Sequence, residues 1–383
     1  MTVTAAQGFE ASGVAIGLKA SGGKDLALVV NRGPRHASAA VFTSNRAQAN
    51  PILWSKQVID DGTVSAIILN SGGANCFTGP QGFQTTHATA EAVAEALEVS
   101  AGDVLVCSTG LIGEQLDRDK LLPGVATAAA QLTVDGGDAA AEAILTTDSH
   151  PKTAVFQGDG WVIGGMAKGA GMLAPGLATM LVVLTTDADL ASDQLDRSLR
   201  AATRVSFDRL DSDGCMSTND QVSLLASGAS GIAPDSETFT AAVREICLDL
   251  ARQLQGDAEG SSHDITIEVH GAVTEEDAVE VGRSVARNNL FKAAVFGNDP
   301  NWGRVLAAIG TTSAPFDPYA VDVTMNGVRV CHAGAPDAPR EEVDLTGRAV
   351  SVVIDLKEGT ESATILTNDL THDYVHENSA YSS

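Results

Sequence analysis

The chain has 383 residues, and 44% of them are apolar, so it can bury a large core as one large or two mid-sized domains. Its 24 basic and 49 acidic residues give a net charge of −25. A surface of that sign repels phosphate backbones and anionic lipid headgroups, which argues against nucleic acid and membranes as partners.

The sequence shows no sign of export or of a membrane span. Residues 1–13 lack a secretory pattern, and the most apolar stretch, 161–184, is interrupted by Lys168, Pro175 and several glycines. We therefore expect a soluble, cytoplasmic protein. The five cysteines are widely spaced without a CxxC pair, which favours reduced packing residues over disulfides or a zinc site. No Cys-His arrangement is legible around Cys215, which we also expect to pack.

The first third of the chain alternates between strand and helix patterns. Alanine, glutamate and leucine dominate residues 85–97, which predicts a helix. Strand patterns occur at 27–31, 39–42 and 64–69. This part of the chain is mixed α/β.

Residues 158–187 are rich in glycine and apolar residues. Within them, 180–185 reads as a buried strand, which the chain enters through a turn at Pro175 and Gly176. This junction is the most unusual passage of the sequence.

The second half contains clearer helix signals. Apolar residues recur every three or four positions from Phe239 to Leu254, after Asp235 and Ser236 as candidate caps, which predicts an amphipathic helix. Residues 265–270 alternate between apolar and polar, as in a half-buried strand.

Three turn or cap signals follow. Thr274 with an aspartate three residues later predicts the start of another helix. Asn326-Gly327 between apolar flanks predicts a hairpin, and 350–366 predicts a second one through Gly359. We find no internal repeat and no clear domain boundary.

Thr179 directly follows the Pro-Gly turn and opens the buried strand. A threonine hydroxyl is a weak nucleophile without a base, and an N-terminal threonine carries one in its own α-amine. An internal threonine gains that amine if its hydroxyl attacks the preceding carbonyl and water opens the ester. The small Gly176 and Ala178 leave room for this attack, although locally an ordinary strand residue is the simpler interpretation.

Several separate motifs resemble the ornithine acetyltransferase family, also called the glutamate N-acetyltransferase family, which acts in the arginine pathway. The segment KGAGMLAPGLATML at 168–181 is similar to its self-cleavage signature, with the cut between Ala178 and Thr179. The resemblance covers essentially the whole chain. The other motifs, in the expected order, are CSTGLIGE at 107–114, LTTD at 145–148, STND at 217–220, DPNWGR at 299–304 and NSAYSS at 378–383.

The resemblance implies that Thr179 is the nucleophile twice, first on the peptide bond and then on the acetyl group of N-acetylornithine. Thr109 and Gly110 match the family's oxyanion-hole pair, a hydroxyl and a backbone N–H. Such a donor typically lowers the barrier by about 3 kcal/mol. Without the resemblance, a Ser-Thr-Gly turn after a strand is the plain alternative.

The family's substrate contacts also have counterparts. Lys168 matches a lysine suited to the α-carboxylate that ornithine and glutamate share, although it could be a solvated loop lysine. Thr146 or Thr147 corresponds to a substrate-contacting threonine, and a helix-to-loop cap is the alternative for either. Glu259 matches a glutamate that contacts the substrate amine or side chain, where a solvated helix end is the alternative. The family's Ala-Thr-Lys after this position is replaced by Ser-Ser-His at 261–263, which puts the role of that lysine in question.

Asn378 and Ser383 match C-terminal substrate ligands of the family, whereas a disordered tail is the default for a terminus. By resemblance the fold is α/β, a self-processed αββα-type sandwich of the aminopeptidase/ornithine acetyltransferase fold with a smaller C-terminal lobe. The cut would give an α chain of 1–178 and a β chain of 179–383, which intertwine and assemble as a heterotetramer of two of each.

The implied reaction is ping-pong transfer of acetyl from N2-acetyl-L-ornithine to L-glutamate through acetyl-Thr179, with the α-amine as base. No cofactor or metal is implied, and acetyl-CoA is an alternative donor in some family members. One rival is an amidase or aminopeptidase of the same fold, in which water accepts the acyl group. Another is a phosphate- or nucleotide-binding module, suggested by Gly22-Gly23-Lys24, but Asp25 follows instead of Ser or Thr and the P-loop glycine spacing is missing.

Overall fold

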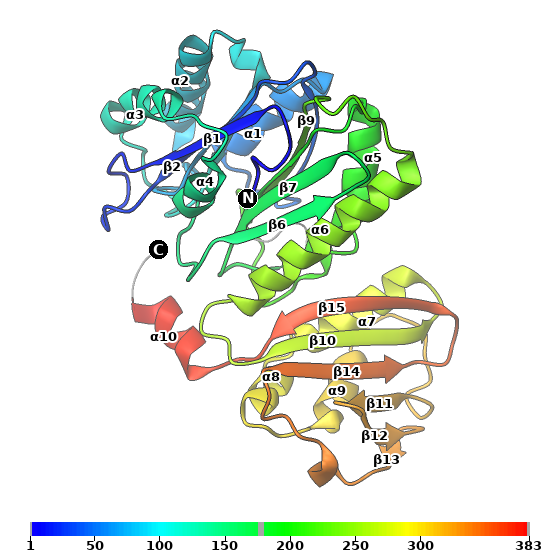
Figure 1. Cartoon of the computed structure of the whole chain (residues 1–383). Helices are drawn as coiled ribbons and strands as arrows, with labels where there is room; N and C mark the ends of the chain where they lie inside the picture. The colour runs from blue at the N-terminus through cyan, green and yellow to red at the C-terminus, as the bar shows by residue number, and fades with distance from the viewer. Residues whose placement is uncertain (1, 175–179, 381–383) are drawn as a thin grey trace.

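The N-terminal lobe is built on two sheets that lie face to face (Figure 1). The structure, a computed structural model, describes residues 2–174 and 180–380. The first sheet has the order β1 (Phe9–Val14), β2 (Leu26–Asn31), β4 (Ala66–Asn70) and β5 (Val104–Ser108). The second has the order β3 (Ala37–Phe42), β9 (Gln221–Ala226), β8 (Leu181–Thr186), β7 (Val162–Lys168) and β6 (Lys152–Gln157).

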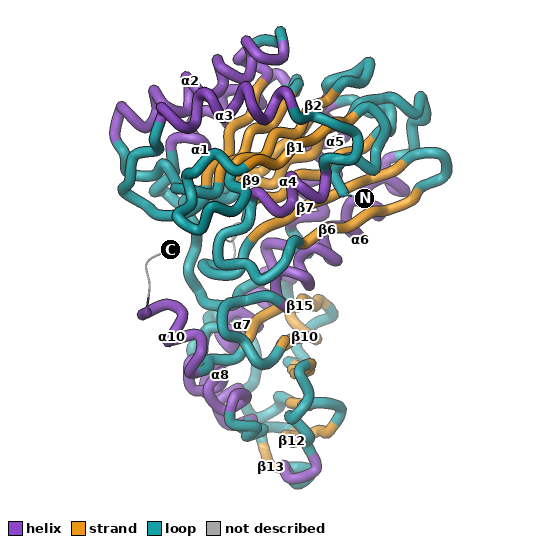
Figure 2. The backbone as a smooth tube through the Cα atoms, turned by 60° about the vertical axis from the view of Figure 1, so that its left-hand side comes forward, coloured by secondary structure: helices purple, strands orange, loops and turns teal. Residues whose placement is uncertain are grey.

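Helices cover the outer faces of both sheets. Figure 2 shows α2 and α3 over the first sheet, and α6 lies against the second. The bounds of the helices in this lobe are α1 (Asn50–Val58), α2 (Gly79–Leu97), α3 (Arg118–Ala130), α4 (Gly137–Ala143), α5 (Ser192–Thr203) and α6 (Ser236–Gly256). Short 3₁₀ turns occur at η1 (Ile59–Asp61), η2 (Ala101–Asp103) and η3 (Phe207–Arg209).

Alternation along the strands creates the layers. In β8, Leu181 and Val183 belong to the core between the two sheets, whereas Val182 and Leu184 belong to the core beneath α5 and α6. Because both faces of this strand are buried, its sequence is continuously apolar. The order of layers is helices, sheet, sheet, helices, which confirms the predicted αββα sandwich.

A smaller C-terminal lobe follows α6, as predicted (Figure 1). Its sheet has the order β13 (Ala335–Pro336), β12 (Val328–His332), β11 (Asp322–Met325), β14 (Ala349–Asp355), β10 (Asp264–Ala272) and β15 (Glu361–Asn368). The other elements are α7 (Glu275–Ala286), α8 (Asn289–Phe296), α9 (Trp302–Ile309), η4 (Arg340–Glu342) and the C-terminal α10 (His372–Ala380). The boundary that the sequence did not reveal therefore lies between α6 and β10.

Local signals placed several elements correctly. Asp235 caps α6 by accepting hydrogen bonds from the N–H groups of residues 237 and 238. Thr274 caps α7, where its hydroxyl accepts from the Asp277 N–H at 3.1 Å. The hairpin through Asn326-Gly327 is formed by β11 and β12. The predicted helix at 85–97 is longer, because Pro80 starts α2 in its first turn.

Two expectations were wrong. The segment 350–366 is not a hairpin, because β10 lies between β14 and β15 and pairs with both. Gly359 crosses the end of β10 so closely that a Cβ there would lie 2.1 Å from the Ala272 oxygen. Cys215 is exposed rather than packed, whereas the other four cysteines are buried, and all five are free thiols. In the described ranges, no helix has the length and apolar character needed to cross a membrane.

Candidate active site

Thr109 and Gly110 lie where β5 ends against the glycine-rich segment after β4. The Thr109 N–H donates to the Asn70 oxygen at 2.9 Å, and the Thr109 oxygen accepts from the Gly73 N–H at 2.9 Å. Gly110 has a φ of +125°, and a Cβ there would lie 2.8 Å from the Gly73 nitrogen. Only glycine fits this position, and its N–H donates to no described residue. A threonine hydroxyl and a free backbone N–H are therefore adjacent, as an oxyanion hole requires.

Asn219, in the STND motif, holds this segment in place. Its Nδ2 donates to the Ala74 oxygen at 2.7 Å and to the Ser108 oxygen at 2.8 Å. Both acceptors flank the oxyanion pair, so the side chain joins β9 to the end of β5. The sequence identified the motif but not this role.

Lys168 extends to Thr109 from the end of β7. Its ammonium is 1% exposed, and its Nζ lies 3.4 Å from Thr109 Oγ1 and 3.9 Å from Asp148 Oδ2. Burial lowers the pKa of Lys168, and the Asp148 carboxylate opposes that shift. The alternative of a solvated loop lysine is thereby excluded, because Lys168 is buried beside Thr109.

Asp148 positions the segment around Lys168. One of its oxygens accepts from the Gly169 N–H at 2.6 Å and from Lys152 Nζ at 2.5 Å, and the other accepts from the Thr146 N–H at 2.9 Å. It therefore ties Thr146 to the lysine strand. No contact of this kind is found for Thr147 among the described residues, and which of the two threonines contacts substrate stays a prediction.

Glu259 comes to the same place from the end of α6. Its N–H donates to the Ala170 oxygen at 3.0 Å, and its carboxylate packs over Gly171, where a Cβ would lie 2.6 Å from Oε2. Asn378 Nδ2 donates to Glu259 Oε2 at 3.0 Å. Glu259 is thus next to the Lys168 strand and the C-terminal helix at once.

The C-terminal helix α10 docks at the junction of the lobes (Figure 1). Gly260 lies under it, and a Cβ there would lie 2.2 Å from the Tyr374 nitrogen. Thr371 Oγ1 donates to the Gly260 oxygen at 2.5 Å and caps the helix by accepting from the Tyr374 N–H. The chain therefore folds back beside Glu259 at least as far as residue 380.

Asp220, the last residue of STND, is fully buried beside the start of β8. Its Oδ1 accepts from the Met180 N–H at 3.1 Å, and its Oδ2 has no hydrogen-bond partner among the described residues. Burial raises the pKa of Asp220 well above its ordinary value. A buried carboxyl group with a raised pKa therefore lies next to Met180, and the sequence did not single it out.

A pocket of about 210 Å³ opens on the other side of Glu259. Asp213 and Asp369 line it with the buried Lys292, whose Nζ donates to the Ser212 oxygen. Burial lowers the pKa of Lys292 and raises that of Asp213. Most residues that line the pocket are polar or charged, so it suits the charged end of a small molecule.

At 261–263, where Ser-Ser-His replaces the family's Ala-Thr-Lys, the structure shows what the histidine contacts. His263 is buried, with Nδ1 at 2.7 Å from Asp369 Oδ2 and Nε2 at 2.9 Å from the Leu345 oxygen. The imidazole therefore anchors Asp369, which lines the pocket beside Glu259. A lysine is not needed at this position to hold that carboxylate.

Of the predicted site residues, the structure brings together Thr109, Gly110, Lys168, Thr146, Glu259 and Asn378. Ala178, Thr179 and Ser383 lie outside the described residues. No group of three or more potential metal ligands gathers in the described part of the chain.

Residues 10–383 match the ArgJ family. The arginine biosynthesis bifunctional protein ArgJ of Streptomyces avermitilis is 66% identical over 383 residues, which is all of both chains, and that of Thermobifida fusca is 58% identical over the same span. A crystal structure of ornithine acetyltransferase from Mycobacterium tuberculosis, complexed with ornithine, is 55% identical. It covers 47% of this chain and 96% of its own, with a TM-score of 0.45. Because the family match covers residues 10–383 and both relatives are similar over their whole length, the chain belongs to the ArgJ family.

Proposed function

We propose that this acyltransferase of arginine biosynthesis transfers acetyl from N2-acetyl-L-ornithine to L-glutamate through an acetyl-Thr179 intermediate. The chain becomes active after it cuts itself between Ala178 and Thr179. The observation that carries the proposal is the family match over residues 10–383, because it spans both the oxyanion pair and the substrate contacts.

Thr179 performs the bond-making step. Its hydroxyl attacks the acetyl carbonyl of N-acetylornithine while its own α-amine takes the proton. The Thr109 hydroxyl and the Gly110 N–H donate to the oxyanion, and the intermediate collapses to an acetyl ester with release of ornithine. The amine of glutamate then attacks the ester, and the same groups work in reverse.

Lys168 binds the α-carboxylate that both substrates share. Its acceptors at 3.4 and 3.9 Å are longer than a usual N–H···O hydrogen bond, so its three donors are not saturated by the described residues. A buried ammonium in that state favours an anionic partner. Either Thr146 or Thr147 adds a hydroxyl contact to the same substrate.

Glu259, with Asn378 and Ser383, holds the amine-bearing end of the substrate. The Glu259 carboxylate lies at the edge of the 210 Å³ pocket and is oriented by Asn378. An acidic group at this end suits the side-chain amine of ornithine, and the same enclosure must accommodate glutamate in the second half of the cycle.

Further parts of the proposal concern assembly and alternatives. The cycle needs no cofactor, and acetyl-CoA is an alternative donor. The fragments 1–178 and 179–383 assemble as a heterotetramer of two of each, and the enzyme is cytoplasmic.

Intact mass under denaturing conditions tests self-cleavage. Wild type should give two fragments that begin at Met1 and Thr179, whereas Thr179→Ala should give one uncut chain. Wild-type protein incubated with N-acetylornithine alone should gain one acetyl group on the fragment that begins at Thr179. An uncut wild-type chain that still transfers acetyl would overturn the mechanism.

The acceptor decides between transferase and amidase. We expect ornithine and N-acetylglutamate to form in equal amounts when glutamate is present. Release of free acetate at the same rate with and without glutamate would instead favour the amidase alternative.

A further inference from the structure

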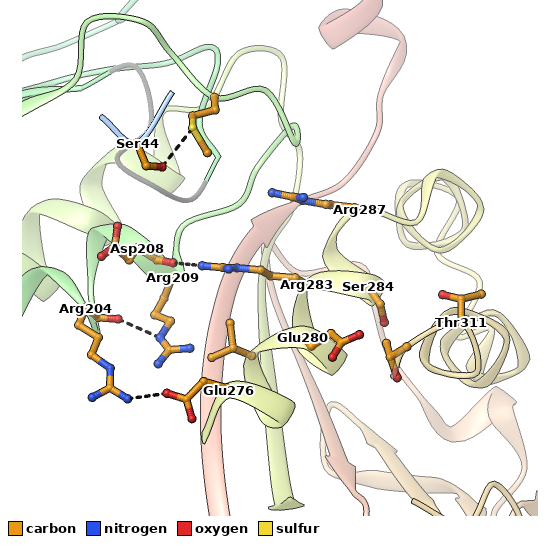
Figure 3. Close-up of a pocket in the computed structure, with 13 residues that line it drawn as sticks. Ser44, Arg204, Asp208, Arg209, Glu276, Glu280, Arg283, Ser284, Arg287 and Thr311 are labelled. Atoms are coloured by element: carbon orange, nitrogen blue, oxygen red, sulfur yellow. Dashed lines mark hydrogen bonds and ion pairs between the residues drawn. The ribbon is translucent and has the colours of Figure 1, made fainter. Parts of the chain in front are cut away.

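One cavity lies away from the predicted site residues. It has a volume of about 800 Å³ and lies between the lobes, with η3 and α5 on one side and α7 on the other (Figure 3). Its volume is in the range of small-molecule sites. Four of the 16 arginines of this acidic chain line it: Arg204, Arg209, Arg283 and Arg287.

Two of these arginines form ion pairs between the two lobes. Arg204 Nη2 lies 3.2 Å from Glu276 Oε1 and also pairs with Glu275. Arg209 Nη2 lies 2.5 Å from the other oxygen of Glu275. These pairs join the lobes and leave little capacity for a ligand.

Arg283 is different. Its Nη2 donates to the Asp208 carbonyl at 2.8 Å, and its Nε is buried without a hydrogen-bond partner among the described residues. No carboxylate within the described residues lies within ion-pair distance of it. A buried unsatisfied donor on a charged group is unfavourable, so the guanidinium is incompletely satisfied in the protein alone.

Arg287 lies four residues further, directly after the end of α7, and faces the same space (Figure 3). Its Nε donates to Asp211 Oδ2 at 2.8 Å, and no described residue accepts from its other two guanidinium nitrogens. The Arg287 side chain is 47% exposed, so these nitrogens are open to solvent, and because a guanidinium offers donors only, a ligand that binds them must be an acceptor. Carboxylate and phosphate oxygens match its planar fork best.

The loop 211–217 separates this cavity from the pocket beside Glu259. Asp211 pairs with Arg287 and Met216 lines the cavity, whereas Ser212 and Asp213 line the smaller pocket. A group that engages Arg287 therefore acts on one face of a loop whose other face adjoins the substrate residue Glu259.

We propose that this interlobe cavity binds a small carboxylate- or phosphate-bearing anion on Arg283 and Arg287, and that the bound anion acts on the acetyl-transfer site through the loop 211–217. The anion accepts hydrogen bonds from the guanidinium groups of Arg283 and Arg287, and it shares the second of these with Asp211. Binding is independent of the proposed function, whereas the effect on acetyl transfer rests on it.

Isothermal titration of the whole protein with inorganic phosphate and with citrate, at ionic strength held constant with sodium chloride, tests the site. We expect saturable binding of at least one probe, and the probe that binds more tightly identifies phosphate or carboxylate as the favoured group. Arg283→Gln should weaken binding at least tenfold. Ser284→Asp, which leaves every arginine in place and adds a negative charge to the cavity lining, should do the same.

Arg197→Gln is the matched control, because it removes the same charge from an exposed pair with Asp193 on α5, outside the cavity. It should bind like wild type. Absence of saturable binding by both probes, or equal affinity in wild type, Arg283→Gln and Ser284→Asp, would overturn the site.

The effect of the bound anion on the acetyl-transfer site is measured separately, through the KM for N-acetylornithine. A saturating probe should change the KM for N-acetylornithine at least twofold in wild type and in Arg197→Gln, but not in Arg283→Gln. Binding without a change of KM would contradict coupling through the loop. Protein that binds the probe but transfers no acetyl group would contradict the proposed function and leave the site intact.

Discussion

Replacing Asp148 with asparagine tests how the site is held together. The substitution keeps the shape of the side chain and removes its charge. The carboxylate is fully buried, 2.5 Å from Lys152 Nζ and 3.9 Å from Lys168 Nζ. Burial alone would raise the pKa of Asp148, but the two lysines outweigh it and hold that pKa well below its ordinary value.

The loss of stability expected for Asp148→Asn depends on which charges remain after the substitution. Removing one partner of a buried ion pair typically costs about 3–5 kcal/mol, because it leaves a charge uncompensated. Lys152 keeps its second carboxylate, Asp257, so we expect the lower end, about 3 kcal/mol of free energy of unfolding. Asp148→Asn should also raise the KM for N-acetylornithine, since Lys168 and Thr146 lose their common anchor.

The contribution of Asp148 to stability should depend on pH. The pKa of Asp148 is lower in the folded state than the value of about 3.9 in the unfolded chain. Its stabilisation is therefore present above the unfolded pKa and is lost as the pH falls through the folded value. The difference between wild type and Asp148→Asn should be largest near neutral pH and should shrink in strong acid.

Urea unfolding of wild type, Asp148→Asn and the control Arg197→Gln measures these effects. The control loses a charge from an exposed pair and should unfold like wild type. The reasoning would be refuted by an Asp148→Asn protein as stable as wild type at neutral pH, or by a difference that does not change in acid.

Three further substitutions probe the oxyanion pair and the buried acid. Thr109→Val should lower kcat by about 10²–10³ with little change in KM, and a kcat within tenfold of wild type in initial-rate assays would contradict the assignment. Gly110→Ala places a Cβ 2.8 Å from the Gly73 nitrogen at a φ of +125°, so calorimetric or urea unfolding should show a loss of about 1–3 kcal/mol. Burial raises the pKa of Asp220, so wild type should lose stability as the pH rises above about 4, by up to about 1.4 kcal/mol per pH unit. Asp220→Asn should lack that slope, and parallel stability curves from pH 4 to 7 would count against a raised pKa of Asp220.

The elements that the sequence predicted correctly depend on near neighbours along the chain. The cap of α6, the Thr274–Asp277 cap and the Asn326-Gly327 turn each involve residues within a few positions of one another. The pairing of β14 and β15 does not. Each pairs with β10, which precedes both by many residues, and no local signal distinguishes that arrangement from a hairpin.

The residues of the candidate site also fall into two groups, those that sequence motifs point to and those that only the structure reveals. The motifs predicted that Thr109, Lys168 and Glu259 act on substrate. They did not reveal that Lys168 lies 3.4 Å from a hydroxyl 59 positions away, or that Asp148 and Asn219 hold the two segments. These supporting contacts are buried polar pairs between distant segments, and only the folded chain brings their partners together.

The sheet explains how a cut between Ala178 and Thr179 would leave the enzyme whole. In the strand order β3, β9, β8, β7, β6, the first strand and the last two precede the cut, and β9 and β8 follow it. Both strands of the second fragment therefore lie between strands of the first, with Lys168 paired opposite Leu181 across the junction. Separating the fragments would break the β3–β9 and β7–β8 ladders and expose the cores on both faces of the sheet. The proposed cleavage can thus release the α-amine of Thr179 while the packing that positions Thr109 and Lys168 stays intact.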